Sequence, residues 1–490
     1  MLITLLTNLS YYLPEFFVIM TMTLLLFLES TYAKGEKGRF LVYLVAAVGL
    51  LISLSLAMAN FHELPKVLFH EAVALDQFST MAKILLISGT LGVVYLGYTT
   101  RDFQDQLRSE FLILCTGVLV GAMLVAGSMN FLSLYVGIEI LSILSYVLAS
   151  LKKHDISSQE AGLKYSLYGA LSSAVMIFGI AHLYGATGTI NFREMATVFT
   201  QLDPDKLNLI KICLVLIFVG LGFKISAFPF HMWSPDVYQG APTPVTAFFA
   251  IVPKIAALTA LCRITFLLME SNTELFQWWS HMIQIIAALT MTVGNLTALG
   301  QSSVKRMLAY SSIGQVGFIL MGLVVSGGQG LGASLFYMTL YLFMTLVAFA
   351  VVDQVVKTYG SDESMFFKGL VHKHPILSIM MAITLFSLAG LPPFGGFVAK
   401  FNILNLVIQQ KSYMLAFIAA LNSVVALFYY LRLAKMIIVD TSDDQTKLKD
   451  LTFIKQLYVC ALTLPVIVGG VAWNGFYHTT TILKLISFKN

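Results

Sequence analysis

The chain has 490 residues, of which 58% are hydrophobic and only 11% are charged, and its net charge is +5. A soluble globular fold is excluded, because such domains usually contain about 25% charged residues and must present polar surface to water. The small net charge says little about partners, and no basic cluster with interleaved aromatic residues indicates nucleic-acid binding.

Fourteen apolar segments are long enough to cross a bilayer, since a spanning helix needs roughly 20 mainly apolar residues. The first is interpreted as a retained span, because neither a positive region nor a cleavage site typical of a signal peptide accompanies it. The expected fold class is an all-α membrane protein, a single polytopic domain over residues 1–490. The predicted spans are residues 12–29, 40–59, 76–97, 110–128, 130–150, 163–184, 208–230, 243–269, 277–299, 306–325, 331–356, 374–409, 412–437 and 453–474.

Two of these segments contain residues that break helices. The seventh ends in the proline-containing run 227–231, and the twelfth is interrupted by the Gly/Pro-rich run 390–396. Lys224 lies just before the first break, and Lys400 lies just after the second. Two interrupted helices in comparable positions, each with a lysine close by, favour a repeated transporter unit.

The lysine and arginine residues of the loops predict the orientation of the chain. Alternate loops carry most of these residues, and such loops usually face the cytoplasm or the mitochondrial matrix. Both termini are therefore expected on the opposite face. The cationic residues of the rich loops are Lys34, Lys37, Arg39, Arg101, Arg108, Lys152, Lys153, Lys305, Arg306, Lys357, Lys368, Lys373, Arg432, Lys435, Lys447 and Lys449.

The sequence contains no recognisable metal or cofactor motif. Each of the four cysteines stands alone in an apolar run, so neither a disulfide framework nor a metal-ligand spacing can be read. No Rossmann glycine pattern, Walker A motif or haem-attachment motif is present. The chain is expected to bind no metal, no nucleotide and no redox centre of its own.

Four charged residues at the expected membrane depth indicate the function. Glu139, Lys224, Lys254 and Lys400 lie in the fifth, seventh, eighth and twelfth spans. Each costs about 2.5–3.5 kcal/mol on insertion scales, so such residues usually have a partner or a use. Desolvation makes a buried lysine release its proton more easily, and a nearby carboxylate reverses the effect. A change in the distance between Glu139 and Lys224 would therefore load or unload a proton, and we predict a proton relay.

Alternatives remain for several of these residues. The four charges could form static ion pairs, although one carboxylate matches only one of three amines. Lys164, beside Glu160, either takes up protons at the membrane surface or extends to the interface, as lysines near helix ends do. His231 either passes protons near neutral pH or is a hydrogen-bonded residue at a loop edge.

Four other residues receive simpler interpretations. Glu15 flanks the first span and is expected at the membrane interface. Arg263, in the eighth span, is interpreted as a contact for a lipid or another subunit. Tyr337 and Tyr341 are interpreted as packing residues.

One long segment, Pro229–Phe248 (PFHMWSPDVYQGAPTPVTAF), resembles the antiporter-like subunits of NADH-quinone oxidoreductase, respiratory complex I. Its Trp-Ser-Pro-Asp-Val-Tyr part resembles the subunit N family in particular. Residues 160–165, 304–314 and 389–400 are also similar to that family, and the resemblance runs from the first span to about Arg432. The loop motif is highly specific, whereas the surroundings of Glu139 are a weaker signal.

The resemblance implies two inverted five-helix repeats, with helices 7 and 12 broken. The repeats would occupy residues 110–269 (helices 4–8) and 277–437 (helices 9–13). Residues 1–109 would form helices 1–3, and residues 453–490 would contain helix 14. Glu139, Lys224, Lys254, Lys400 and Lys164 match family positions. Lys400 argues against subunit M, which typically has glutamate there, and the chain lacks the long lateral helix of subunit L.

The resemblance further implies that the chain is part of an enzyme and translocates protons, while NADH oxidation and quinone reduction occur in other subunits. NADH, FMN, iron–sulfur clusters and quinone would be bound by those partners. Expected neighbours are subunits K and M, the lateral helix of subunit L and the lipid bilayer. The chain's length and complete set of spans favour a bacterial cytoplasmic (inner) membrane over a mitochondrial inner membrane. Alternatives are a multi-subunit cation/proton antiporter, a related hydrogenase or ferredoxin-dependent complex, and a structural membrane anchor.

Overall fold

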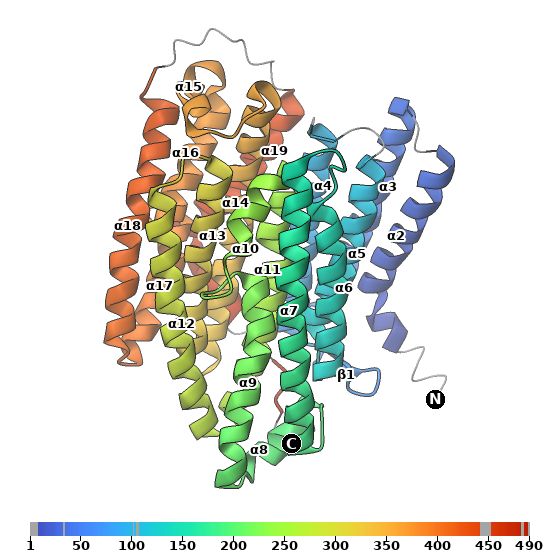
Figure 1. The fold of residues 1–490 in the computed structure, drawn as a ribbon, viewed down its shortest axis with the longest axis vertical. Helices are drawn as coiled ribbons and strands as arrows, with labels where there is room; N and C mark the ends of the chain where they lie inside the picture. Colours follow the sequence, from blue (N-terminus) through green and yellow to red (C-terminus); the bar gives the residue numbers. More distant parts are fainter. Residues whose placement is uncertain are drawn as a thin grey trace.

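Long apolar helices lying side by side make up nearly all of the computed structural model (Figure 1). The structure describes residues 8–32, 35–100, 102–103, 107–441, 452–481 and 485–488. Within these residues, 13 helices are long and apolar enough to cross a membrane. The remaining predicted span, residues 374–409, is divided between two shorter helices, α16 (Pro375–Ala389) and α17 (Gly395–Gln409). The prediction of an all-α multi-pass membrane protein is confirmed.

The helices follow the predicted segments in chain order, and a small hairpin lies between the second and third. The hairpin pairs β1 (Lys66–Leu68) with β2 (Val73–Leu75) antiparallel. The helices are α2 (Leu13–Tyr32), α3 (Gly35–Asn60), α4 (Gln77–Thr99), α5 (Leu107–Gly127), α6 (Phe131–Ala149), α7 (Ile156–Thr187), α8 (Phe192–Thr200), α9 (Pro204–Ile225), α10 (Trp233–Gly240), α11 (Thr243–Ser271), α12 (Thr273–Leu299), α13 (Val304–Leu320), α14 (Gly328–Tyr359), α15 (Leu370–Lys373), α16 (Pro375–Ala389), α17 (Gly395–Gln409), α18 (Tyr413–Ile438), α19 (Phe453–Val471) and α20 (Trp473–Thr481), with 3-10 turns η1 (Met321–Val324) and η2 (Ser364–Phe367).

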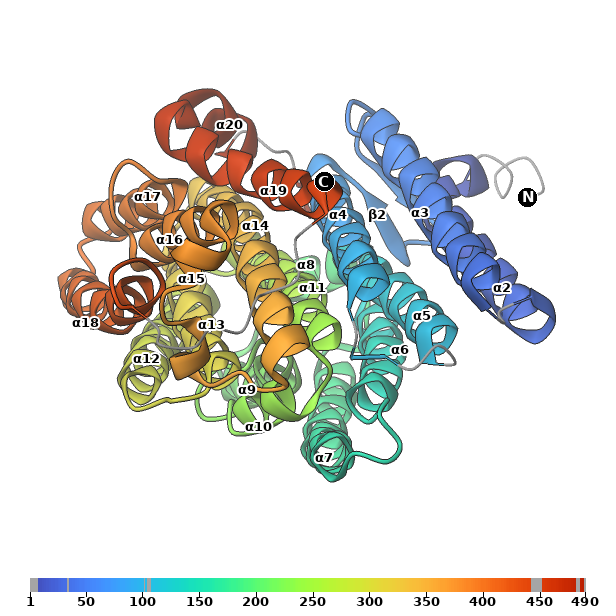
Figure 2. The ribbon, with the colours of Figure 1, turned by 90° about the horizontal axis from the view of Figure 1, so that it is seen from above.

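The interior of the bundle is formed by mainly apolar helices that are buried on nearly every face. From above, α2 and α3 lie at one edge and α18 at the other, while α11 lies inside (Figure 2). Helix α11 contacts α4, α5, α9 and α14, and almost all of its residues are buried. A helix that is hydrophobic all round has no face for water, so burial inside the bundle is its stable position.

Two groups of five spans have the same cycle of neighbours. In the first group, α5 contacts α6, α6 contacts α7, α7 contacts α9, α9 contacts α11, and α11 contacts α5. In the second group, α12 contacts α13, α13 contacts α14, α14 contacts α16, α16 contacts α18, and α18 contacts α12. The broken helices α9/α10 and α16/α17 occupy the same place in each cycle.

Both predicted helix breaks are present. Helix α9 ends at Ile225, where Ser226 adopts a left-handed conformation (φ 59°), and the chain resumes as α10. Helix α16 ends at Ala389, and the following Gly390 adopts a left-handed conformation (φ 88°), where a Cβ atom would lie 2.9 Å from Cδ of Lys400. Proline lacks an N–H and cannot continue the helical bonding, so each interruption follows from its local sequence. The peptide bonds that precede Pro229 and Pro393 are cis.

Candidate functional site

The three lysines predicted at membrane depth are all buried. Their exposed fractions are 1% for Lys224 on α9, 0% for Lys254 on α11 and 8% for Lys400 on α17. None of the ion pairs among the described residues includes any of the three. Three buried amines without a direct counter-charge are unusual, because an unpaired charge is costly in a low-dielectric interior.

Glu139 and Lys224 are close but do not form a direct ion pair. Glu139, half-buried on α6, accepts a hydrogen bond from the hydroxyl of Ser173 on α7. Lys224 is within electrostatic reach of the Glu139 carboxylate. Its Nζ atom has no hydrogen-bond partner in the described part of the chain, and it faces the rings of Tyr146 and Tyr165, each at 4.9 Å from the ring centre. The two groups do not form a direct ion pair here, and the pairing of Glu139 with Lys224 stays a prediction.

Lys254 contacts two polar side chains from neighbouring helices. Its Nζ atom donates to Oγ of Ser312 on α13 at 2.7 Å and lies 5.5 Å from the ring centre of Tyr238 on α10. Helix α10 also carries Trp233, whose ring stacks on Tyr165 at 4.2 Å. The short helix α10 therefore lies between the surroundings of Lys224 and those of Lys254.

Lys400 is bound by the end of the broken helix. Its Nζ atom donates to the backbone oxygens of Leu388 at 2.9 Å and Ala389 at 3.1 Å, at the C-terminus of α16. The last carbonyls of a helix have no partner within the helix, and they carry partial negative charge. The break at Gly390 therefore creates a binding site for a cation, and this site is formed by backbone oxygens and contains no carboxylate.

A polar face of α13 connects the surroundings of Lys254 with those of Lys400. Gln315 lies four residues after Ser311 and three after Ser312, so each serine is a neighbour of Gln315 on the helix surface. Gln315 donates to Tyr430 at 3.0 Å and, also at 3.0 Å, to the Leu388 oxygen that accepts from Lys400. Ser311 is hydrogen-bonded to the same Tyr430 hydroxyl. This connection was missed from the sequence, although the spacing of the polar residues in an apolar span could have indicated it.

Tyr337 also belongs to this connection, because its hydroxyl donates to the side-chain oxygen of Gln315. Tyr337 is also fully buried, as expected for a packing residue, and the hydrogen bond is an addition to that interpretation. Tyrosine is an adaptable residue at such places, since its ring packs with apolar neighbours while its hydroxyl finds a polar partner.

His231 is buried in the interruption between α9 and α10, with 6% of its surface exposed. Its ring stacks on Phe228 with the ring centres 5.7 Å apart. The Nδ1 atom has no hydrogen-bond partner among the residues described. The structure therefore places His231 beside the break, apart from the hydrogen-bonded connection on α13.

Lys164 lies in a surface cluster and is not part of the buried set. Its side chain is 37% exposed and forms ion pairs with Glu160 at 2.6 Å and with Asp236 on α10 at 2.7 Å. Arg306 on α13 binds the other oxygen of Asp236, also at 2.7 Å. Partial burial works to raise the pKa of Asp236, but the hydrogen bonds from Lys164 and Arg306 prevail and hold this pKa below its ordinary value. Asp236 thus ties α10 to α7 and α13.

Asp236→Asn is expected to reduce the acid sensitivity of the fold. Because the pKa of Asp236 is lower in the folded state, its stabilising contribution is present above the unfolded value of about 4 and is lost as the pH falls through the folded value. Thermal unfolding in detergent, measured from pH 7 to pH 3, should show a smaller acid-induced loss in the variant than in the wild type. Glu160→Gln, which removes the more exposed partner of Lys164, should change the curve less. Superimposable curves for Asp236→Asn and the wild type would contradict this role.

Three buried ion pairs were not predicted from the sequence. Glu15 pairs with Lys83 at 2.5 Å, with exposed fractions of 1% and 5%, so it is buried inside the protein, and its expected position at the membrane interface stays a prediction. Arg263 pairs with Asp76 at 2.9 Å inside the protein, so its interpretation as a lipid or subunit contact was also wrong. The third pair joins Lys455 on α19 to Asp353 on α14 at 3.3 Å. Lys83 and Asp353 lie within predicted spans, so the rule that identified Lys224 could have found them.

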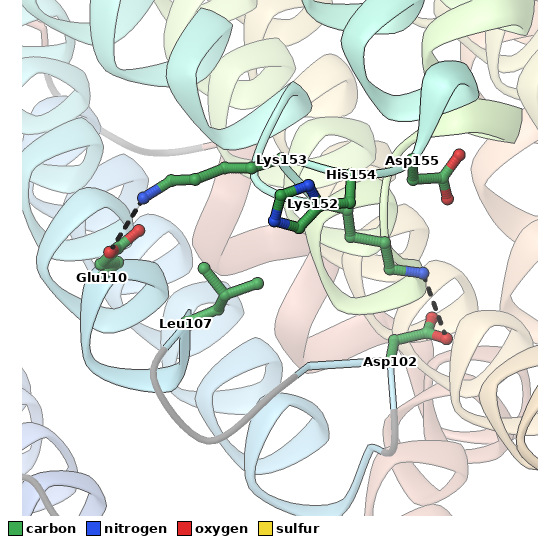
Figure 3. A pocket seen from close by; sticks show the side chains of 7 residues that line it. All are labelled: Asp102, Leu107, Glu110, Lys152, Lys153, His154 and Asp155. Carbon is green, nitrogen blue, oxygen red and sulfur yellow. Dashed lines mark hydrogen bonds and ion pairs between the residues drawn. The ribbon is translucent and has the colours of Figure 1, made fainter.

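A pocket with charged walls lies beside the α4–α5 and α6–α7 connections (Figure 3). Lys153 pairs with Glu110 at 3.4 Å, and Lys152 pairs with Asp102 at 3.6 Å. Both signs of charge therefore line this pocket, and each of its two lysines pairs with a carboxylate. The four cysteines are free, and the part of the chain that the structure describes contains no group of three or more potential metal ligands.

Comparisons with known proteins agree with this arrangement. Residues 128–426 match the family model described as NADH:quinone oxidoreductase/Mrp antiporter, transmembrane. The chain is 40% identical to the NADH-quinone oxidoreductase subunit N of Magnetococcus marinus over 395 residues, 80% of each chain. A chain of respiratory complex I from Thermus thermophilus is similar in structure, with a TM-score of 0.79, 29% identity and coverage of 94% of this chain and 97% of that one.

The fold is shared beyond complex I. A chain of the Mrp complex from Dietzia sp. DQ12-45-1b aligns with a TM-score of 0.82 over 96% of each chain, but with only 19% identity. At that identity the likeness concerns the fold alone. The family match covers more than half of the chain, and the chain belongs to the NADH:quinone oxidoreductase/Mrp antiporter transmembrane family.

Proposed function

We propose that the chain is the N-type membrane-arm subunit of a proton-translocating NADH-quinone oxidoreductase, and that Glu139, Lys224, Lys254 and Lys400 relay its protons. The observation that carries the relay is the burial of three lysines without a direct ion pair in the described structure. Static ion pairs would satisfy each amine with a carboxylate. Here the amines bind ring faces, one hydroxyl and two backbone oxygens, which are neutral partners.

The chemistry of the relay follows from the neutral partners. A lysine that is far from any carboxylate holds its proton only weakly in a dry interior, so a small change in its surroundings is enough to load or release it. At Lys224, a change in the distance to the Glu139 carboxylate would be such a change. The polar face of α13 supplies hydrogen-bonding groups between Lys254 and Lys400. Protons would move along this line while electrons pass through partner subunits.

We propose that Lys164 and His231 lie at the ends of this proton path. Lys164 lies at the surface beside Glu160 and Asp236, where it can exchange protons with water. His231 lies beside the break that follows Lys224 and can carry protons near neutral pH.

We infer that the chain contains two five-helix repeats of opposite orientation, residues 110–269 and 277–437, between the N-terminal helices and helix 14. The identical cycle of neighbours in the two groups supports the repeat. The inversion follows from counting, because five crossings bring the chain to the opposite face before the second group begins. Lys224 and Lys400 then occupy related places beside related breaks.

The proposed function also requires partner subunits in the membrane. The similar proteins are subunits of a multi-subunit oxidoreductase, so we expect other subunits of such a complex as the partners. We propose subunits K and M and the lateral helix of subunit L as neighbours, with NADH, FMN, iron–sulfur clusters and quinone bound by partner subunits. The proposed location is a bacterial cytoplasmic membrane.

The second candidate is a cation/proton antiporter of the multi-subunit type, which the shared fold of the Mrp chain permits. The sequence favours the oxidoreductase, because 40% identity to a subunit N greatly exceeds 19% identity to the Mrp chain.

Purification of the native complex after mild solubilisation separates the two candidates. We expect mass spectrometry to identify flavin-binding and iron–sulfur companions, and the purified complex to reduce quinone with NADH. After reconstitution, addition of NADH should acidify the lumen of the vesicles. A complex of membrane subunits alone, with cation-driven proton movement and no NADH oxidation, would contradict the proposal and establish the antiporter.

A further inference from the structure

Each of the three buried lysines lies over the face of an aromatic ring. Lys224 faces Tyr146 and Tyr165, each at 4.9 Å from Nζ to the ring centre. Lys254 faces Tyr238 at 5.5 Å, and Lys400 faces Phe318 at 4.6 Å. These distances are within the range in which a ring attracts a cation, up to about 6 Å. The relay proposed above counts these rings only as neutral partners and assigns them no role of their own.

Lys224 lies over more ring faces than Lys254 or Lys400 does. Tyr146 comes from α6 and Tyr165 from α7, so two helices supply rings to a lysine on a third. Phe223, the preceding residue on α9, adds a ring face at 5.5 Å. The Nζ atom has no hydrogen-bond partner among the described residues, so the faces of these rings are the groups that lie against its charge.

The two tyrosine rings are fixed by their neighbours. Tyr165 is fully buried and stacks on Trp233, with the ring planes 7° apart. Tyr146 contacts Tyr165 edge to face at 4.9 Å. A Cβ atom at Gly169 would overlap the Tyr146 hydroxyl, so the glycine at this position of α7 leaves the room that the tyrosine fills. Rings held in this way offer their faces to Lys224 without rearrangement.

A ring face has an advantage over a carboxylate as the partner of a relay lysine. It stabilises the protonated amine through its quadrupole, which acts on the charge and not on a particular N–H bond. The three N–H donors of the ammonium therefore stay free to pass a proton on. A carboxylate at the same place would hold the proton in a static ion pair.

We propose that Tyr146 and Tyr165 form a ring pair that holds protonated Lys224 and so sets the pH range in which this lysine carries protons. The inference rests on the proposed relay through Lys224. Among the described residues, the carboxylate of Glu139 on α6 interacts electrostatically with Lys224. The titratable groups that face Lys224 are Tyr146 and Tyr165. Helices α11 and α12 also pack against α9, and none of their described residues forms a hydrogen bond with Nζ of Lys224.

The test replaces the ring of Tyr146 and keeps the rest of the complex intact. Tyr146→Leu removes the ring, whereas Tyr146→Phe keeps the ring and removes only the hydroxyl. Tyr168→Leu is the matched control, since Tyr168 lies on α7 near Tyr165 but is 51% exposed. The purified complex of each variant is reconstituted in vesicles, and protons translocated per NADH oxidised are measured from pH 6 to pH 9.5.

In Tyr146→Leu we expect the decline of this ratio at alkaline pH to move about 1 unit toward acid, a tenfold loss of proton affinity. Tyr146→Phe and Tyr168→Leu should follow the wild-type profile. An unchanged profile in Tyr146→Leu, or an equal shift in Tyr146→Phe, would overturn the role of the ring. If the leucine variant does not assemble, Tyr146→Met, which fills the space with a flexible apolar side chain, gives the same comparison.

Lys224→Ala in the same vesicles separates this inference from the relay. A wild-type ratio in Lys224→Ala would contradict the relay itself. A lowered ratio in Lys224→Ala together with a wild-type profile in Tyr146→Leu would leave the relay intact and exclude the ring pair.

Discussion

Arg263→Ala should destabilise the protein by about 3–5 kcal/mol, because removal of one partner leaves a buried charge uncompensated. Asp76 and Arg263 have exposed side-chain fractions of 0% and 1%. Both oxygens of Asp76 accept from the guanidinium, at 2.9 and 3.2 Å. The same carboxylate caps α4 through the N–H of Ser79 and accepts from the N–H of Ile486 near the end of the described chain. Loss of the arginine therefore weakens a junction of several segments.

The expected loss can be measured as a lower midpoint of thermal unfolding of the complex in detergent. Arg193→Ala is the matched control, because Arg193 pairs with Glu71 at the surface, where both side chains are 36% exposed. Exposed pairs contribute about 0–1 kcal/mol, so this control should unfold near the wild-type midpoint. The double variant Arg263→Met/Asp76→Asn removes both charges and should recover part of the loss. A single variant as stable as the double variant would show that the buried charge is not the cause.

The spans and the helix breaks could be predicted because their causes are local. Length and apolar composition determine where a helix crosses the membrane, and proline next to glycine determines where it stops. The positions of Lys224 and Lys400 beside the breaks follow from the same short stretches. For these features the residues that decide the structure are neighbours in the chain.

The partners of the buried charges could not be predicted, because they come from distant parts of the sequence. Asp76 and Arg263 are 187 positions apart, and Lys254 donates a hydrogen bond to Ser312, which is 58 positions away in the sequence. Apolar spans carry little information about which helix lies beside which, since lipid and helix surfaces are equally apolar. The ring pair around Lys224 has the same origin, because α6, α7 and α9 meet only in the folded bundle.

Lys224→Ala should lower the number of protons translocated per NADH oxidised. A positioned group that accepts and donates a proton typically contributes about 10²–10⁴-fold to the rate of transfer, so proton flow through this chain should fall by about a hundredfold or more. The buried lysine has no ion pair in the described structure, so the change leaves no unpaired carboxylate in direct contact. Electron transfer from NADH to quinone, measured in detergent, reports whether the complex has assembled.

Lys211→Ala is the matched control for this measurement. Lys211 lies on the same helix, α9, and pairs at the surface with Glu274 at 3.1 Å. Both substitutions remove one positive charge from α9, but only one removes a buried amine. A difference between the two variants therefore reports on the buried position.

The most direct test of the relay is the ratio of protons translocated to NADH oxidised in vesicles that contain the wild-type, Lys224→Ala or Lys211→Ala complex. The relay predicts a lowered ratio in Lys224→Ala and a wild-type ratio in Lys211→Ala. Equal ratios in all three complexes, with assembly confirmed by electron transfer, would contradict it.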